Sequence, residues 1–133
     1  MRAHIAAIMT MLAPLDHQVH FVDVPDAPTY PYILLWSSAG VPGREVPLCD
    51  KHTDLDTQLG VTCVAATPLG VLTLAGLVRP ILDGSEPVVP GRSVRLDLTD
   101  SRDVQVDRDV TMLQPDRHPA YGVDLYRLRS TPV

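Results

Sequence analysis

Basic residues are scarce in this sequence, and that shortage is its most informative absence. Asparagine does not occur, lysine occurs once (Lys51) and glutamate twice, against fourteen aspartates and ten arginines. The formal net charge is −5. Such a chain lacks the broad basic surface that drives phosphate binding, so the composition argues against sequence-specific DNA binding. Acidity suits instead a surface that DNA passes without adhering to it.

Cysteine and long hydrophobic runs are also scarce. Of the two cysteines, Cys63 lies in a run of small apolar residues and is expected to be a core residue; we expect both Cys49 and Cys63 to be reduced thiols. The apolar N-terminal run is broken by His4 and Thr10 and lacks the purity of a signal peptide, and no stretch approaches membrane-spanning length. We therefore expect a soluble, cytosolic chain with no membrane partner.

Recognised catalytic motifs are missing as well. Ser37 and Ser38 do not stand in a GxSxG motif, and the glycines of residues 60–84 are spread along a helical pattern rather than gathered into a phosphate-binding loop. Cys63 is a poor candidate nucleophile because burial raises a thiol pKa and no positioned histidine is evident. The sequence predicts a protein that is not an enzyme, with no catalytic residues and no cofactor.

One cluster of side chains could still carry chemistry. Asp50, His52, Asp54 and Asp56 alternate along the chain, and carboxylate and imidazole groups of this kind can bind a divalent metal. A small metal-dependent hydrolase using His52, Asp54 and Asp56 is therefore the alternative from a different functional class. No second ligand set follows at a recognised spacing, so we interpret the cluster as a solvated loop and predict no metal site.

The chain is organised around residues 60–84, where a run of small and β-branched residues predicts a strand buried on both faces. Thr67 and Pro68 are typical of a helix start, and Gly84 of a helix stop. Pro80 is expected to bend this helix or cut its last turn. Its apolar residues recur on one broad helical face. That face consists of Val71, Leu74, Ala75, Val78, Ile81 and Leu82.

The remaining patterns predict a short amphipathic helix at residues 2–13 and further strands. The expected strands are residues 18–24, 30–36, 58–66, 94–98 and 123–129. With 133 residues, of which 45% are hydrophobic, the chain has room for one core. The fold class expected is α+β: a single domain, residues 1–133, with a mixed, mostly antiparallel sheet flanked by an N-terminal helix and a central core helix. Thirteen prolines and eight glycines predict long interaction loops around it.

Three stretches together carry a family resemblance. They are VDVPDAPTYPYILLW, LGVTCVAATPLGVLTLAGLVRPIL and VDRDVTMLQPDRHPAYGVDLYRLRSTP. Their order and spacing resemble the tail terminator (tail-completion) proteins of long, non-contractile-tailed phages. The resemblance implies a mixed sheet flanked by helices and a structural virion protein whose subunits form a hexameric ring. It implies no catalytic residues.

In that family the ring caps the tail tube, stops tube polymerisation and joins the tail to the head. The resemblance thus implies as partners a tail tube protein, a neck or connector protein and further copies of the chain, with DNA passing through unbound. It implies localisation in the virion tail or neck after assembly in the host cytoplasm. Another head-to-tail connector, a neck or stopper protein, remains the nearer alternative.

A closed ring needs two different contact patches on each subunit. Residues 37–57 and 100–116 are expected to supply them, because both are charged and irregular. The interface candidates are Arg44, Glu45, Leu48, Asp50, Asp54, Arg102, Asp107, Arg108 and Arg117. Aspartates of either segment are expected to line the lumen.

Overall fold

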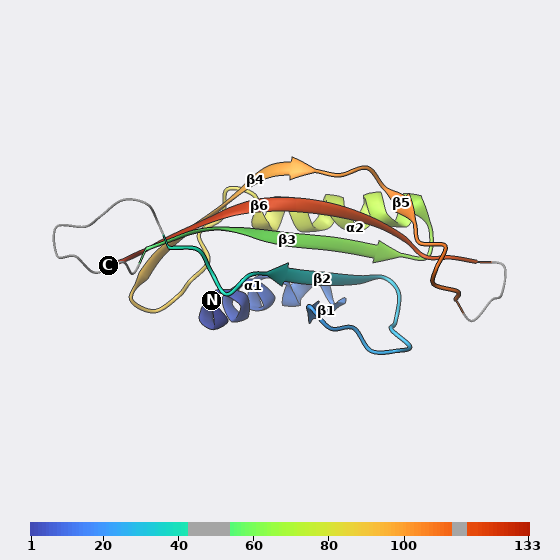
Figure 1. Ribbon diagram of the computed structural model, residues 1–133, viewed down its shortest axis with the longest axis horizontal. Helices are drawn as coiled ribbons and strands as arrows, with labels where there is room; N and C mark the ends of the chain where they lie inside the picture. The colour runs from blue at the N-terminus through green and yellow to red at the C-terminus, as the bar shows by residue number, and fades with distance from the viewer. Residues whose placement is uncertain (43–53, 113–116) are drawn as a thin grey trace.

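A computed structural model describes residues 1–42, 54–112 and 117–133. The elements follow one another along the chain as α1 (Arg2–Leu12), a 3₁₀ turn η1 (Ala13–Leu15), β1 (Gln18–Phe21), β2 (Tyr32–Ser37), β3 (Leu55–Ala65), α2 (Pro68–Leu82), β4 (Arg92–Ser101), β5 (Gln105–Val106) and β6 (Ala120–Pro132). This is an α+β domain, as the sequence predicts. Figure 1 shows its elongated form, with the strands running along the long axis.

The six strands form one mixed sheet in the order β1-β2-β3-β6-β4, with β5 also beside β6. β1 pairs with β2 in parallel, and the other pairings are antiparallel. The two longest strands, β3 and β6, lie in continuous register from the Leu55–Ser130 pair to the Ala65–Ala120 pair. The expectation of a mixed, mostly antiparallel sheet is therefore confirmed.

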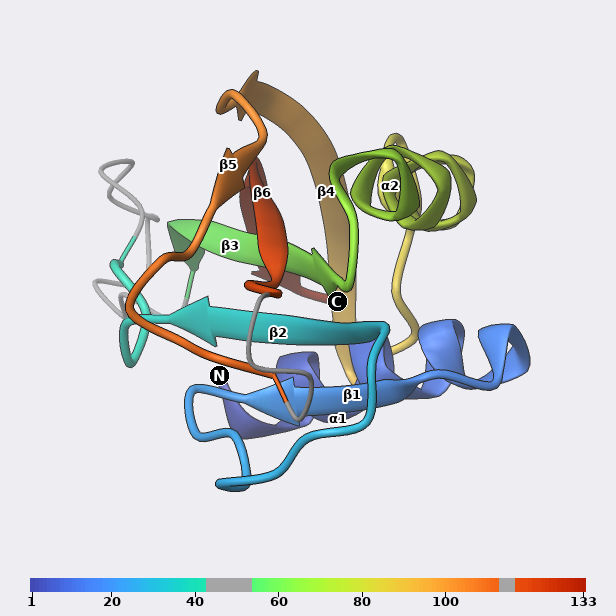
Figure 2. The same ribbon diagram turned by 90° about the vertical axis from the view of Figure 1, so that its right-hand side faces the viewer.

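Both helices cover the same face of this sheet (Figure 2). Ile8 and Leu12 of α1 share one buried cluster with Leu74 and Val78 of α2, and Leu59 of β3 belongs to the same cluster. From Leu59 to Ala65 every residue of β3 is buried, which confirms the expected strand covered on both faces. The core thus lies between the two helices and the centre of the sheet.

The start of α2 agrees with its sequence signals. Thr67 precedes the helix in an extended conformation, and its hydroxyl accepts a hydrogen bond from the Gly70 N–H at 3.1 Å. Pro68 follows at the first helical position, where its missing N–H leaves no partner unsatisfied. Val71, Leu74, Val78 and Leu82 are buried, and Ala75 and Ile81 are packed against the core with partial exposure.

Several expected boundaries are wrong for identifiable reasons. The strand expected at 18–24 ends at Phe21, because Val22 has a positive φ of 64°. β3 begins at Leu55, since Asp56 and Gln58 point to the polar side of the sheet and continue the ladder with β6. Pro80 does not cut the last turn of α2, which runs on to Leu82. Gly84 has a φ of 71°, consistent with the predicted stop.

Candidate functional site

Beneath α2 lies a buried polar network. Arg79 of α2 forms two hydrogen bonds, both 2.8 Å long, from Nε and Nη2 to the Asp124 carboxylate of β6. Ser101 at the end of β4 donates to Asp124 Oδ1 at 2.7 Å and accepts from Arg79 Nη2 at 2.7 Å. This network ties the helix to two strands that are adjacent in the sheet.

The charges of this network balance each other, because Arg79 and Asp124 form an ion pair. Burial raises the Asp124 pKa, but hydrogen bonds from Arg79 and Ser101 and the charge of Arg79 outweigh burial, so the pKa is below its usual value. Burial raises the pKa of the neighbouring Cys63 thiol to about 12. A hollow of about 270 Å³ opens beside these groups. At neutral pH the Cys63 thiol is protonated, and the negative charge of the Asp124 carboxylate is balanced by Arg79. This is a poor arrangement for nucleophilic chemistry.

A second buried network joins α1 to the other end of β6. His4 Nε2 lies 2.8 Å from Ser130 Oγ, and Arg92 Nε donates to the same oxygen at 2.6 Å. Since the Arg92 guanidinium can only donate, the Ser130 hydroxyl can give its own hydrogen to an unprotonated His4. Burial lowers the His4 pKa below 6.5, and the positive charges of the N-terminus and Arg92 lower it further.

This arrangement predicts a pH-dependent stability with a definite sign. In the unfolded chain His4 binds a proton near pH 6.5, and in the folded chain it does so only at lower pH. The contribution of His4 to the free energy of unfolding is therefore fully present above pH 6.5 and decreases as the pH falls below that value. His4→Gln keeps a hydrogen-bond acceptor without a titrating group. Urea unfolding at pH 7.5 and 5.5 should show a smaller loss of stability in this variant than in the wild type. Equal losses in both proteins would mean that His4 is not the source.

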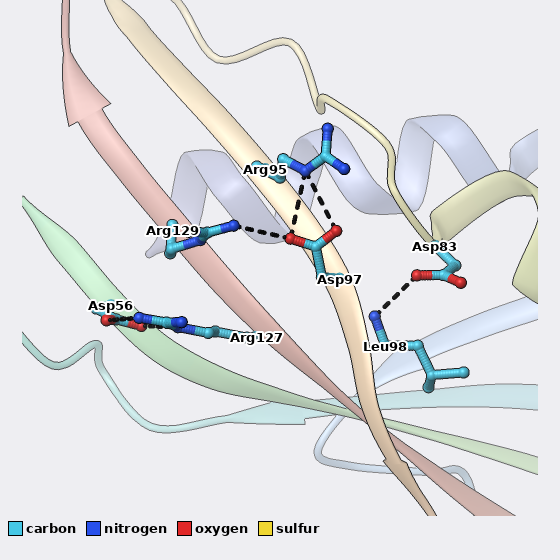
Figure 3. Close-up of polar contacts among 7 residues, drawn as sticks. All are labelled: Asp56, Asp83, Arg95, Asp97, Leu98, Arg127 and Arg129. Atoms are coloured by element: carbon cyan, nitrogen blue, oxygen red, sulfur yellow. Dashed lines mark hydrogen bonds and ion pairs between the residues drawn. The ribbon is translucent and has the colours of Figure 1, made fainter.

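On the opposite face of the sheet, charged residues pair across neighbouring strands (Figure 3). Arg127 of β6 donates to Asp56 of β3 at 2.8 and 2.6 Å. Asp97 of β4 accepts from Arg95 at 3.2 and 3.3 Å and from Arg129 at 3.0 Å. Hydrogen bonds from Arg95, followed by those from Arg129, hold the Asp97 pKa below its usual value.

These ion pairs bear on the alternative of a metal-dependent hydrolase. Asp56, one of the three residues proposed for it, accepts hydrogen bonds from Arg127, and His52 lies outside the described residues. Within residues 1–42, 54–112 and 117–133, no three His, Cys, Asp or Glu side chains gather in a way that could hold a metal ion.

The predicted interface residues are scattered in the structure. Arg44, Glu45, Leu48 and Asp50 lie outside the described residues. Asp54 lies just before β3, and Arg102 pairs with Asp100 at 3.2 Å. Asp107 and Arg108 follow β5, where the Asp107 N–H bonds to the Pro119 carbonyl at 2.8 Å. The Arg117 carbonyl accepts from the Met112 N–H at 3.0 Å, so part of the 100–116 segment folds against the residues before β6.

The outer face of α2 is an apolar surface that the sequence reasoning missed. Leu69, Leu72 and Leu77 are 75%, 57% and 45% exposed. Arg79 is the one charged residue between Pro68 and Leu82, and it is bound to Asp124. The sequence did contain a signal for this surface, because the residues of α2 are apolar around its whole circumference. That pattern is typical of a helix covered on every side.

Comparisons with known proteins bear on the fold. No protein-family model matches the sequence, and no curated protein matches it. A chain of the solved structure described as the virion of a native gene transfer agent (GTA) particle has a similar fold, with a TM-score of 0.56 and 14% identity. The similarity covers 93% of this chain and 92% of that chain.

Among the described residues, no helix is long and apolar enough to cross a membrane.

Proposed function

We propose that this protein is a structural component of a phage-like virion, of the tail terminator class. The observation that carries the proposal is the similarity in fold, over nearly the whole of both chains, to a chain of a gene transfer agent virion. The independent resemblance of three sequence stretches to tail terminators points to the same class. In this proposal the chain forms a ring, hexameric as in the family, on the end of the tail tube.

The charge distribution supports a role at a channel that DNA crosses. The chain is acidic overall, with a net charge of −5. Among the described residues, Arg79 of α2 and Arg95, Arg127 and Arg129 of the sheet are each held by an aspartate. Arginines bound in this way present little free positive charge to a phosphate backbone. Either Asp100, Asp103 and Asp107 or the aspartates of residues 50–56 remain our candidates for the lumen.

Two experiments test this proposal. Negative-stain electron microscopy of the purified protein should show closed rings. Phage or particles lacking this chain should build tails of irregular length, because nothing stops tube polymerisation. If those tails have normal length but do not join to heads, the chain is a connector rather than a terminator. Metal-dependent cleavage of DNA or a phosphoester that is lost in His52→Ala would identify the hydrolase instead.

A further inference from the structure

The apolar outer face of α2 is convex and carries no free charge. Leu69, Leu72 and Leu77 project from it, and no heavy atom lies within 4 Å of where a side chain at Gly76 would begin. A helix of this length spans roughly 22 Å, so the face is a strip rather than an isolated exposed leucine. Apolar strips of this kind on a protein surface mark sites of contact with other proteins.

A second part of the surface is concave and has similar chemistry. A hollow of about 820 Å³, here called the trough, is lined by residues of the β1–β2 connection, by Tyr32, and by residues 110–112 and Arg117. Its lining comprises Val24, Pro25, Asp26, Ala27, Pro28, Thr29, Tyr30, Tyr32, Val110, Thr111, Met112 and Arg117. Ten of these twelve side chains are uncharged, so the trough can receive an apolar strip without burying many charges.

The two surfaces are different patches of the subunit, which come near each other at Tyr30, because Tyr30 lines the trough and also a hollow beside Leu77. Tyr32 alternates along β2 with Ile33, which is buried in the core beneath the helices, so Tyr32 points away from α2. Figure 2 shows α2 beside one end of the sheet and the β1–β2 connection looping below β1 before it rises to the start of β2. A contact between two different patches of the same kind of subunit is heterologous, and successive rotations can close it into a ring.

The edge of the sheet at β4 offers no simpler way to associate, because the segment after α2 occupies it. Leu96 donates to the Ser85 carbonyl at 3.0 Å and accepts from the Gly84 N–H at 2.8 Å. The Leu98 N–H bonds to Asp83 Oδ1 at 2.9 Å (Figure 3). These bonds protect the edge from pairing with a strand of another chain.

From these surfaces we propose that the outer face of α2 of one subunit docks into the trough of the next copy of the same chain. Copies with a net charge of −5 repel one another, so a contact between them is favoured where both surfaces are nearly free of charge. The α2 strip and the trough meet that condition and complement each other in shape, one convex and one concave. This inference rests on the proposed ring and names the surfaces that close it.

Leu69→Asp combined with Leu72→Asp tests the convex surface. Both side chains are largely exposed, and Leu69 lies in the first turn of α2, where an aspartate is favourable, so the variant should fold. Val88→Asp is the matched control, because Val88 is 86% exposed and belongs to neither surface. In analytical ultracentrifugation, the wild type and Val88→Asp should sediment as the ring, and the double variant as a folded monomer.

Cross-linking tests which surfaces meet. In a Cys49→Ser background, Leu72→Cys and Ala27→Cys proteins are mixed and treated with a short bis-maleimide. Cys63 is buried, so it should not react. The mixture should give cross-linked dimers containing one chain of each kind, and neither protein alone should give dimers.

Each other outcome overturns the inference in a recognisable way. If the double variant still forms rings, the α2 face is not the interface, but the ring itself stands. If Leu72→Cys cross-links to itself, two α2 helices face each other and the trough is not the partner. If the double variant forms rings but no longer binds tail tubes, another virion protein covers α2. A wild type that stays monomeric at every concentration overturns both this inference and the proposed ring.

Discussion

Replacing Leu74 with aspartate is expected to unfold the protein. Leu74 is 2% exposed at the centre of the cluster that joins α2, α1 and the sheet. Truncating a buried leucine costs roughly 2–5 kcal/mol, and an unpaired buried carboxylate adds several more. A domain of this kind has a total free energy of unfolding of about 5–15 kcal/mol. Far-UV circular dichroism should show lost secondary structure or a melting temperature lowered by tens of degrees.

The matched control lies five residues earlier on the same helix. Leu69→Asp makes the same chemical change at a side chain that is 75% exposed, in the first turn of α2. Its melting temperature should stay near that of the wild type, because no core contact is lost and the carboxylate lies near the helix N-terminus. If Leu74→Asp were soluble and melted as cooperatively as Leu69→Asp, the buried face of α2 would have been assigned wrongly.

The elements that the sequence predicts best are those with local signals. The strand before Thr67 and the helix after it follow from a buried apolar run, a capping hydroxyl and a helical period, all within about twenty-five residues. Strand ends are less well predicted, because pairing rather than local composition sets them. β6 starts at Ala120, before the expected Val123, since Ala120 and Tyr121 pair with both β3 and β5.

Polar contacts between distant parts of the chain leave no local trace in the sequence. Asp56 meets Arg127 across 71 positions, so its place in an alternating Asp-rich stretch gave no hint of an ion-pair partner. Asp124 likewise finds Arg79 only because β6 passes beneath α2. Residues with the chemistry of a metal site and residues with the chemistry of an ion pair look alike until the sheet register is known.

Charged and apolar side chains occupy different parts of the described surface. Aspartates hold arginines on the sheet face seen in Figure 3, and the edge at β4 is occupied by the chain itself. Exposed apolar side chains include Leu69, Leu72 and Leu77 on the outer face of α2, and Val110 in the trough. In the proposed ring, contacts that involve apolar groups and few charges would depend little on salt and would hold beside densely charged DNA.

A single methyl group at Gly60 is expected to disturb the open face of the sheet. Gly60 lies in β3 opposite Trp36 of β2, and a Cβ at this position would overlap the indole atoms Cε2, Cζ2 and Cδ2. Gly60→Ala must therefore push the ring away and strain or break its 3.0 Å hydrogen bond from Nε1 to Thr62 Oγ1. Overpacking of this kind costs about 1–3 kcal/mol. Trp36 is the one tryptophan of the chain, so its fluorescence reports the displacement directly.

The same substitution at Gly76 should have the opposite sign. Gly76 lies within α2 with open space around it, and alanine is favoured over glycine in a helix by about 0.8–1 kcal/mol. Gly76→Ala should raise the melting temperature and leave the Trp36 emission unchanged, whereas Gly60→Ala should lower the melting temperature and shift the emission to longer wavelength. Because both changes add one methyl group, their difference isolates the close contact between Trp36 and the β3 backbone. A Gly60→Ala protein with wild-type stability and emission would show that the indole does not lie against Gly60 in solution.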